Sequence, residues 1–383
     1  MSRRPLRLLF TLPWPTRSGG AEEMLQALVE GGPSHGYESE VAFLQEGPWP
    51  EQLRAEGVPV HVLGAGRVRE LHTGARAVVR LARVLRRRRP DVIVNWVAKT
   101  QLYGSPAAVL AGMRDRVVWW QHAIPEGHWI DRVATALPAA AIGYTSHAAA
   151  EAQQRIRPAR PMFVVAAGTR LPEPSRVAAA VPAGLARLPE GTLVVGLVAR
   201  LQPWKGQDRL VRAAALLRER GHAVHVLLVG GDSWELAPDY ARELPQLIAD
   251  LQMADHVTMT GEVPDAGPYI DRMDVLVNAS DPEPFGIVLL EAMARGVAVV
   301  AVDRGGPREI VGAGVSGMLA RSGDPTALAD AIEPLLDSPE LRARLAAAGL
   351  ERVRAEFTED AMSRNFATQM RALVAAREGA RSR

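Results

Sequence analysis

The stretch DVLVNASDPEPFGIVLLEAMARG, residues 274–296, contains the structural unit from which the rest of the chain is predicted to be built. Its first residues, Asp274–Asn278, form a short apolar run typical of a buried strand. A helix is expected over Gly286–Arg295, closed by Gly296, and a second strand over Val297–Val302. A strand, a helix and a strand in this order predict a parallel sheet covered by helices.

The same alternation extends through the whole chain. Apolar runs predict further strands at Leu6–Leu12, Ser39–Leu44, Val58–Leu63, Asp91–Asn95, Arg116–Trp120, Ala139–Thr145, Leu193–Ala199, Ala223–Val229 and Val257–Thr260. Helices are predicted at Glu22–Glu30, Thr73–Arg89 and Gln207–Arg220, and over the remainder from Pro325 onward. We therefore predict the α/β class, with two facing Rossmann-like domains, parallel sheets and an inter-domain ligand cleft at the carboxyl ends of the strands.

Leu171–Gly191 interrupts the alternation, because it is rich in proline and alanine and has no sustained period. We predict an N-terminal acceptor-binding domain over 1–172, a linker over 173–191 and a C-terminal nucleotide-sugar domain over 192–355. The last segment, 356–383, is expected to be a helix that returns to the N-terminal domain.

Composition excludes several classes of site. The 383 residues include no cysteine, so disulfides and thiolate metal ligands or nucleophiles are excluded. The formal net charge of +2 argues against a nucleic-acid partner. No apolar run is long enough for a transmembrane segment, and Leu6–Pro13 is too short for a signal sequence. We expect a cytoplasmic protein.

Basic residues are distributed unusually. Of 45 lysines and arginines, only Lys99 and Lys205 are lysine, which suggests that a compact ammonium is required at those positions. The run Arg80–Arg89 has two interpretations. It could contact an anionic inner membrane face or an acidic acceptor. Alternatively, it is a solvated helix C-terminus, and we favour this interpretation.

The loop before Gly286 contains Glu283, and Glu291 follows within the predicted helix. The first amides of a helix are unpaired and carry partial positive charge, so they bind anionic or hydroxyl-rich ligands. A carboxylate such as Glu291 accepts two hydrogen bonds from a diol, which suits ribose. The alternative is a capping acid and an exposed helical glutamate.

A second loop, from Arg200 to Gly206, follows the predicted strand Leu193–Ala199. Arg200 and Lys205 lie five positions apart, where two cations could clamp a diphosphate and replace a metal ion. The glycine-rich run of a P-loop is missing. A solvated loop is the alternative, which the rarity of lysine disfavours.

Two weaker signals lie in the N-terminal half. Gly19 and Gly20 follow the first strand and would let backbone amides approach a phosphate, or they form an ordinary turn. The first strand is not followed by the G-x-G-x-x-G fingerprint of dinucleotide-binding proteins, which argues against a hydride-transfer site. His122 follows the strand Arg116–Trp120 at its carboxyl end, where it could be functional or structural.

Taken in order, these segments resemble the family-4 retaining glycosyltransferases of the GT-B fold, also called glycosyltransferase group 1. Glu283–Glu291 matches the E-x7-E signature of the family, and Arg200 with Lys205 matches its basic pair. Ser18–Glu22 is similar to its N-terminal glycine loop. Ala167–Arg170 departs from the usual Asn-Gly-Val-Asp, so contacts of that asparagine are not carried over.

The resemblance implies transfer from a nucleoside-diphosphate sugar, UDP- or GDP-linked, to an acceptor hydroxyl with α configuration, without a cofactor or metal. It assigns the diphosphate to Arg200, Lys205, Gly19 and Gly20, and sugar hydroxyls to Glu283. The amides of Phe285, Gly286 and Ile287 would bind the sugar or its phosphate, and His122 would contact the sugar or help to position the acceptor. Glu291 would hold the ribose, and the backbone around Glu262 and Val263 would bind the base.

The acceptor remains open among natural products, glycans and lipid-linked sugars. Two other functions are also considered: a different GT-B activity, such as a nucleotide-sugar epimerase or a phosphorylase, and a non-catalytic nucleotide-sugar sensor. The E-x7-E segment argues against the first, and the intact set of charged residues argues against the second.

Overall fold

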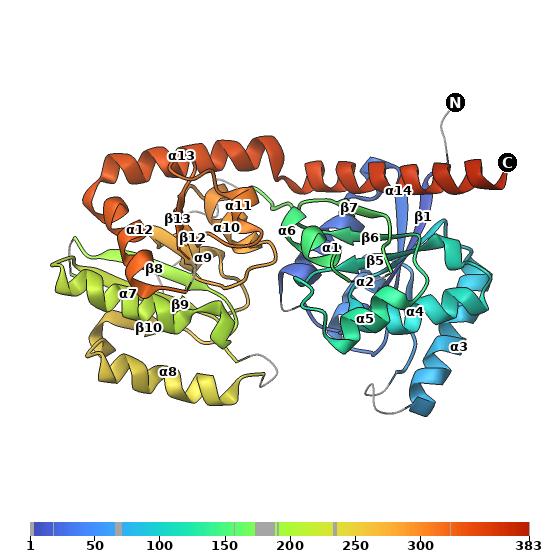
Figure 1. The fold of residues 1–383 in the computed structure, drawn as a ribbon, viewed down its shortest axis with the longest axis horizontal. Coiled ribbons are helices and arrows are strands. Elements are labelled where there is room, and N and C mark those ends of the chain that lie inside the picture. The colour runs from blue at the N-terminus through green and yellow to red at the C-terminus, as the bar shows by residue number, and fades with distance from the viewer. Residues whose placement is uncertain are drawn as a thin grey trace. The chain divides into compact units, whose positions relative to one another are not determined.

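The computed structural model describes residues 4–17, 19–65, 71–156, 158–172, 188–189, 191–232, 236–321 and 323–382 (Figure 1). The chain forms two compact units. Unit 1 comprises Met1–Ala167 and Glu359–Arg383, and unit 2 comprises Gly168–Thr358. Most of the predicted linker lies outside the described residues. No helix in the described part of the chain is both long and apolar enough to cross a bilayer.

Unit 1 contains a seven-stranded parallel sheet in the order β3-β2-β1-β4-β5-β6-β7. Its strands are β1 (Leu6–Leu12), β2 (Tyr37–Phe43), β3 (Val60–Val62), β4 (Val92–Asn95), β5 (Val117–Gln121), β6 (Ala141–Tyr144) and β7 (Met162–Val164). Its helices are α1 (Gly20–Gly31), α2 (Pro48–Ala55), α3 (Leu71–Arg88), α4 (Ala98–Leu110), α5 (Trp129–Ala136), α6 (His147–Gln153) and α14 (Glu359–Arg381).

Unit 2 contains a six-stranded parallel sheet in the order β10-β9-β8-β11-β12-β13. Its strands are β8 (Leu193–Val198), β9 (Val224–Val229), β10 (Val257–Met259), β11 (Val275–Asn278), β12 (Ala298–Val302) and β13 (Met318–Ala320). Its helices are α7 (Gln207–Glu219), α8 (Pro238–Asp250), α9 (Gly267–Ile270), α10 (Ile287–Ala294), α11 (Pro307–Ile310), α12 (Pro325–Asp337) and α13 (Pro339–Glu356).

The predicted class, two α/β domains with parallel sheets, is confirmed. The sequence prediction missed α4, which contains Gly104 and Pro106 and buries the polar side chains of Thr100, Gln101 and Ser105. A helix that contains helix breakers and buries polar residues shows no apolar stripe. The strands β7 and β13 were also missed, because three residues are too few for a visible alternation.

Alternate residues of β1 show how the sheet of unit 1 is covered on both faces. Leu9 belongs to the apolar cluster that α3 and α4 form with the sheet. Phe10 points the other way and stacks on Phe366 of α14, with ring centroids 5.9 Å apart. The C-terminal helix α14 is therefore part of the core of unit 1.

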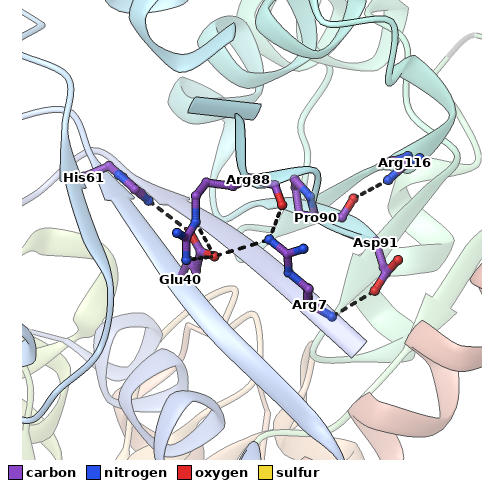
Figure 2. A network of polar contacts seen from close by, with 7 residues as sticks. All are labelled: Arg7, Glu40, His61, Arg88, Pro90, Asp91 and Arg116. Carbon is purple, nitrogen blue, oxygen red and sulfur yellow. Dashed lines mark hydrogen bonds and ion pairs between the residues drawn. The ribbon is translucent and has the colours of Figure 1, made fainter. Parts of the chain in front are cut away.

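A polar network joins β1, β2 and β3 to the end of α3 (Figure 2). Glu40 of β2 is almost fully buried and accepts hydrogen bonds from Arg88 at 2.7 and 2.8 Å. His61 of β3 lies 3.0 Å from the same carboxylate. Burial alone would raise the pKa of Glu40, but the hydrogen bonds and charges of His61 and Arg88 lower it below its usual value.

The same network changes the interpretation of the arginine run at the end of α3. Arg88 turns inward to Glu40, Arg86 donates to the Leu110 carbonyl, and Arg80 donates to the Leu63 carbonyl at 2.9 Å. A solvated helix C-terminus is therefore wrong for Arg88, whereas Arg80 and Arg86 are exposed although they donate these hydrogen bonds. Arg83 and Arg87 remain exposed.

We expect Glu40→Gln to reduce the free energy of unfolding by about 1–3 kcal/mol at pH 7, because Arg88 loses its charged partner. The pKa of Glu40 is lowered in the folded state, so its ionised form stabilises the fold above the ordinary pKa of 4.5. The difference in free energy of unfolding between the wild type and the variant should therefore decrease as pH falls below that value. Urea unfolding followed by tryptophan fluorescence checks this, because six of the eight tryptophans lie in unit 1.

Glu38→Gln is the matched control, because Glu38 lies on the same strand and is exposed. Equal losses in the two variants, or a loss in Glu40→Gln that does not change with pH, would contradict the assignment.

Candidate functional site

The strand order of unit 2 places β8 beside β11, with Val195 paired to Val275. The chain reverses its direction of travel across the sheet between these two strands, and ligands of open α/β sheets bind beyond the carboxyl ends at such a point. The loops that follow β8 and β11 contain the predicted residues Arg200, Lys205 and Glu283.

The two loops contact each other directly. The Asp281 amide donates to the Trp204 carbonyl at 2.9 Å. Gly206 has a φ of +74°, and a Cβ there would lie 2.5 Å from the Ala279 carbonyl oxygen. Only glycine fits so close to the second loop in a left-handed conformation. The sequence thus fixes Lys205 against the end of β11.

Lys205 and Glu283 form an ion pair, with Nζ 2.8 Å from Oε2. Their side chains are only 17% and 9% exposed. The ammonium also lies 3.9 Å from the centroid of the Trp204 ring, which adds a cation–π contact. An ammonium has three N–H donors, so Lys205 retains capacity for a ligand oxygen while it binds Glu283.

The pKa of Glu283 reflects two opposing causes. Burial would raise it, but the charge of Lys205 and hydrogen bonds from Lys205, Ser280 and the Phe285 amide bring it below its ordinary value. Glu283 is therefore ionised at neutral pH and serves as a hydrogen-bond acceptor, as binding to sugar hydroxyls requires. The Phe285 amide, which was predicted to bind the sugar or its phosphate, donates a hydrogen bond to this carboxylate in the structure.

A third loop, after β12, supports the backbone of Glu283. The Gly306 amide donates to the Glu283 carbonyl at 2.9 Å. Gly305 has a φ of +81°, and a Cβ there would lie 2.2 Å from the same carbonyl oxygen. Larger residues at Gly305 would displace the loop that carries Glu283.

Helix α10 begins directly after this loop. Its N-cap residue is Gly286, with a φ of +100°, and no side chain caps its first turn, where Ile287 lies. Phe285 is buried and packs 6.4 Å from the ring of Phe357. Glu291 is half-buried in the second turn. The glutamates at both ends of the predicted signature therefore belong to one loop and helix.

The loop after β9 adjoins the end of β8 on its other side, and the loop after β10 adjoins the loop after β9. Gly230 donates to the Gly261 carbonyl at 3.0 Å, and the Arg200 carbonyl accepts from Gln207 Nε2 at 2.8 Å. Glu262 is exposed and Val263 is half-buried. The residues predicted to bind the nucleotide base thus lie on the same edge of the sheet as Arg200.

The remaining predicted residues belong to unit 1. Gly19 is the N-cap of α1 and Gly20 its first residue. Glu22 is 4% exposed, and its Oε2 lies 3.0 Å from where a Gly19 Cβ would be. A buried carboxylate therefore lies beside the glycine pair, whose role in phosphate binding stays a prediction. Ser18 lies outside the described residues.

His122 directly follows β5, and its ring lies 4.7 Å from that of Trp96. Its Nε2 atom is buried and has no hydrogen-bond partner in the described part of the chain. Burial lowers the pKa of His122 to about 3. The imidazole is therefore neutral at physiological pH and can exchange hydrogen bonds with a ligand without carrying charge.

Sequence reasoning missed three residues that hold the loops of unit 2. Trp204 lies against the Lys205 ammonium, Ser280 hydrogen-bonds Glu283, and Arg209 donates to the Ala279 carbonyl at 2.9 Å. Trp204 could have been noticed as the neighbour of a rare lysine. Arg209 is indistinguishable in sequence from the other arginines of a helix.

Comparison with known proteins finds matches for both halves of the chain. The family model for "Glycosyl transferases group 1" matches residues 186–352, and the model for a "Glycosyl transferase 4-like domain" matches residues 19–169. The Anabaena protein Alr3699/HepE, solved in complex with UDP-glucose, is 26% identical. It superposes with a TM-score of 0.81 over 96% of this chain and 100% of its own.

Curated relatives match over shorter stretches. D-inositol 3-phosphate glycosyltransferase of Stackebrandtia nassauensis is 41% identical over 45% of this chain and 40% of its own length. A GDP-mannose-dependent phosphatidylinositol monomannoside mannosyltransferase of Mycobacterium tuberculosis is 35% identical over 50% of each chain. The matches thus span half or less of these relatives.

The two family models, placed end to end on the two parallel-sheet units, show that the chain belongs to the group 1 glycosyltransferases of the GT-B fold.

Proposed function

We propose that the chain is a retaining glycosyltransferase that moves a hexose from a nucleoside-diphosphate sugar to an acceptor hydroxyl with α configuration. The buried Lys205–Glu283 pair at the reversal point of the unit 2 sheet is the observation that carries this proposal. In this proposal Lys205 is the cation for the leaving diphosphate, and Glu283 is the carboxylate that binds sugar hydroxyls. HepE has been solved with UDP-glucose and the mycobacterial relative is named for GDP-mannose, so the proposed donor is UDP- or GDP-linked.

In the proposed reaction, the bond between the anomeric carbon and the β-phosphate oxygen breaks as the acceptor oxygen bonds to the same face of that carbon. The acceptor proton passes to the departing phosphate oxygen, so no protein nucleophile is required. Arg200 and Lys205 stabilise the charge that develops on the diphosphate, a role that is otherwise commonly taken by a metal ion. Glu291 is proposed to hold the ribose.

We expect Lys205→Ala to lower the rate of sugar transfer by about 100- to 1000-fold, the usual loss when one group that stabilises the transition-state charge is removed. The variant should also unfold more easily, by about 3–5 kcal/mol, because a buried carboxylate loses its partner. The double variant Lys205→Met with Glu283→Gln removes both charges, so it should recover much of this stability and none of the activity.

Nucleotide release from the donor and urea unfolding measure the two effects, with Arg212→Met on the exposed side of α7 as control. Transfer of sugar by the double variant at the wild-type rate would contradict the assignment of the donor site to Lys205 and Glu283.

We expect UDP or GDP to raise the melting temperature of the whole chain, because a ligand that binds the folded state stabilises it. At a hundredfold excess over the dissociation constant the stabilisation is about 2.7 kcal/mol. A thermal-shift series with UDP, GDP and their sugars identifies the base, and Lys205→Ala should reduce the shift. Equal shifts with UDP and with uridine would argue against a diphosphate clamp.

Unit 1 is also proposed to contact an anionic membrane surface peripherally through the exposed arginines of α3. Arg83→Gln with Arg87→Gln should weaken co-sedimentation with phosphatidylglycerol vesicles, by about 1 kcal/mol for each arginine near the surface. Arg212→Gln in unit 2 is the control. Unchanged co-sedimentation of the double variant would exclude this contact.

A further inference from the structure

Lys99, the other of the two lysines, takes no part in the proposed donor site. It is the second residue of α4, directly after β4. In unit 1, β4 lies beside β1, and the order β3-β2-β1-β4 reverses the direction of travel between them, as it does between β8 and β11 in unit 2. Lys99 therefore lies at the ligand-binding edge of the unit 1 sheet.

The local structure holds Lys99 in this place. Asn95, the last residue of β4, accepts a hydrogen bond from Thr11 of β1 at 2.9 Å and donates to Gln101 of α4 at 2.7 Å. Gly104 allows the helix to approach, because a Cβ there would lie 1.8 Å from the Asn95 side-chain oxygen. The first turn of α4 is thereby fixed against the ends of two central strands.

Nothing in the described part of the chain neutralises the Lys99 ammonium: it has no carboxylate within ion-pair distance and no hydrogen bond from its side chain. The side chain is half-buried, and burial lowers its pKa. A cation in the first turn of a helix is also disfavoured by the helix dipole. Lys99 therefore lacks the compensation that a partly desolvated charge requires, and an anionic ligand would supply it.

A second observation points to a ligand at the same edge. The buried Nε2 atom of His122 also lacks a partner, and the His122 ring contacts Trp96, three residues before Lys99. Trp96 in turn donates to the Ala21 carbonyl at 2.9 Å, which joins this loop to the start of α1. The unpartnered ring nitrogen of His122 and the Lys99 ammonium thus follow the neighbouring strands β5 and β4 at the same edge of the sheet.

We infer that Lys99 binds an anionic group of the acceptor, a phosphate ester, at the carboxyl edge of the unit 1 sheet, with His122 exchanging a hydrogen bond at the same site. The inference rests on the proposed glycosyltransferase function and adds the chemical class of its acceptor. A phosphate ester fits because its oxygens accept charge-assisted hydrogen bonds from an ammonium. The first amides of α4 also favour an anion, because no side chain caps them.

The phosphate ester could belong to a free phosphorylated polyol or to a lipid headgroup. The presence of only two lysines makes the test direct, because protein labelled with ¹³Cε-lysine gives two side-chain signals, which Lys99→Gln assigns. The donor site is first saturated with UDP or GDP, whichever stabilises the protein. Glycerol 3-phosphate is then titrated in one sample and phosphatidylinositol vesicles in another.

The nucleotide should move the Lys205 signal and leave that of Lys99 in place. Glycerol 3-phosphate or the vesicles should then move the Lys99 signal and shift its titration to higher pH. The probe that acts identifies the source of the phosphate. Lys99→Gln should weaken binding of that probe about 10- to 100-fold, the loss expected for a hydrogen bond between charged groups, whereas Arg114→Gln, exposed before β5, should not change it.

The inference is overturned if neither probe moves the Lys99 signal, if Lys99→Gln binds the probe normally, or if the nucleotide alone moves that signal, which would assign Lys99 to the donor. A Lys205 signal whose position changes with neither UDP nor GDP would instead contradict the proposed function. The two failures therefore appear in different resonances.

Discussion

The ion pair between Lys205 and Glu283 is the interaction on which the candidate site of unit 2 depends. Its two members lie 78 residues apart in sequence and follow β8 and β11, which are adjacent strands of the sheet. A buried ion pair gains little over an apolar pair, because desolvation offsets most of the Coulomb attraction. Its retention at a strand edge is better explained by a ligand that uses both charges than by stability.

Close backbone contacts make that pair geometrically fixed. Gly206 holds the first loop against Ala279, and Gly305 holds the third loop against Glu283. Arg209 adds a hydrogen bond from α7 to the Ala279 carbonyl. Since all three contacts meet the short segment between β11 and α10, the position of Glu283 is set by two neighbouring loops and helix α7, as a preorganised site requires.

The sequence was sufficient to predict most of the strands, several helices and the individual charges, because these leave local signals. The bounds of β1 were predicted to the residue, and Lys205 and Glu283 were both placed in loops at strand ends. Their contact was not predictable, because it depends on which strands are neighbours. Arg88 shows the opposite difficulty: it belongs to a run of arginines typical of a solvated surface, yet its partner Glu40 lies on a distant strand. Local pattern carries no information on such partners.

The two units carry a lysine at equivalent positions in their sheets, but the surroundings of the two ammonium groups differ. Each sheet places a lysine beside its central reversal point, but Lys205 is paired with a carboxylate, whereas Lys99 has no counterion in the described structure. A paired ammonium remains charged and ordered without a ligand, which suits a group that must stabilise a leaving diphosphate as it forms. An unpaired, partly desolvated ammonium gains most from the arrival of an anion, which suits recognition of a substrate group that keeps its charge throughout the reaction.

The neutral His122 is consistent with this division, since an imidazolium there would add a second uncompensated charge to unit 1. The arrangement of charge in the two units therefore distinguishes a site that responds to developing charge from one that selects for existing charge.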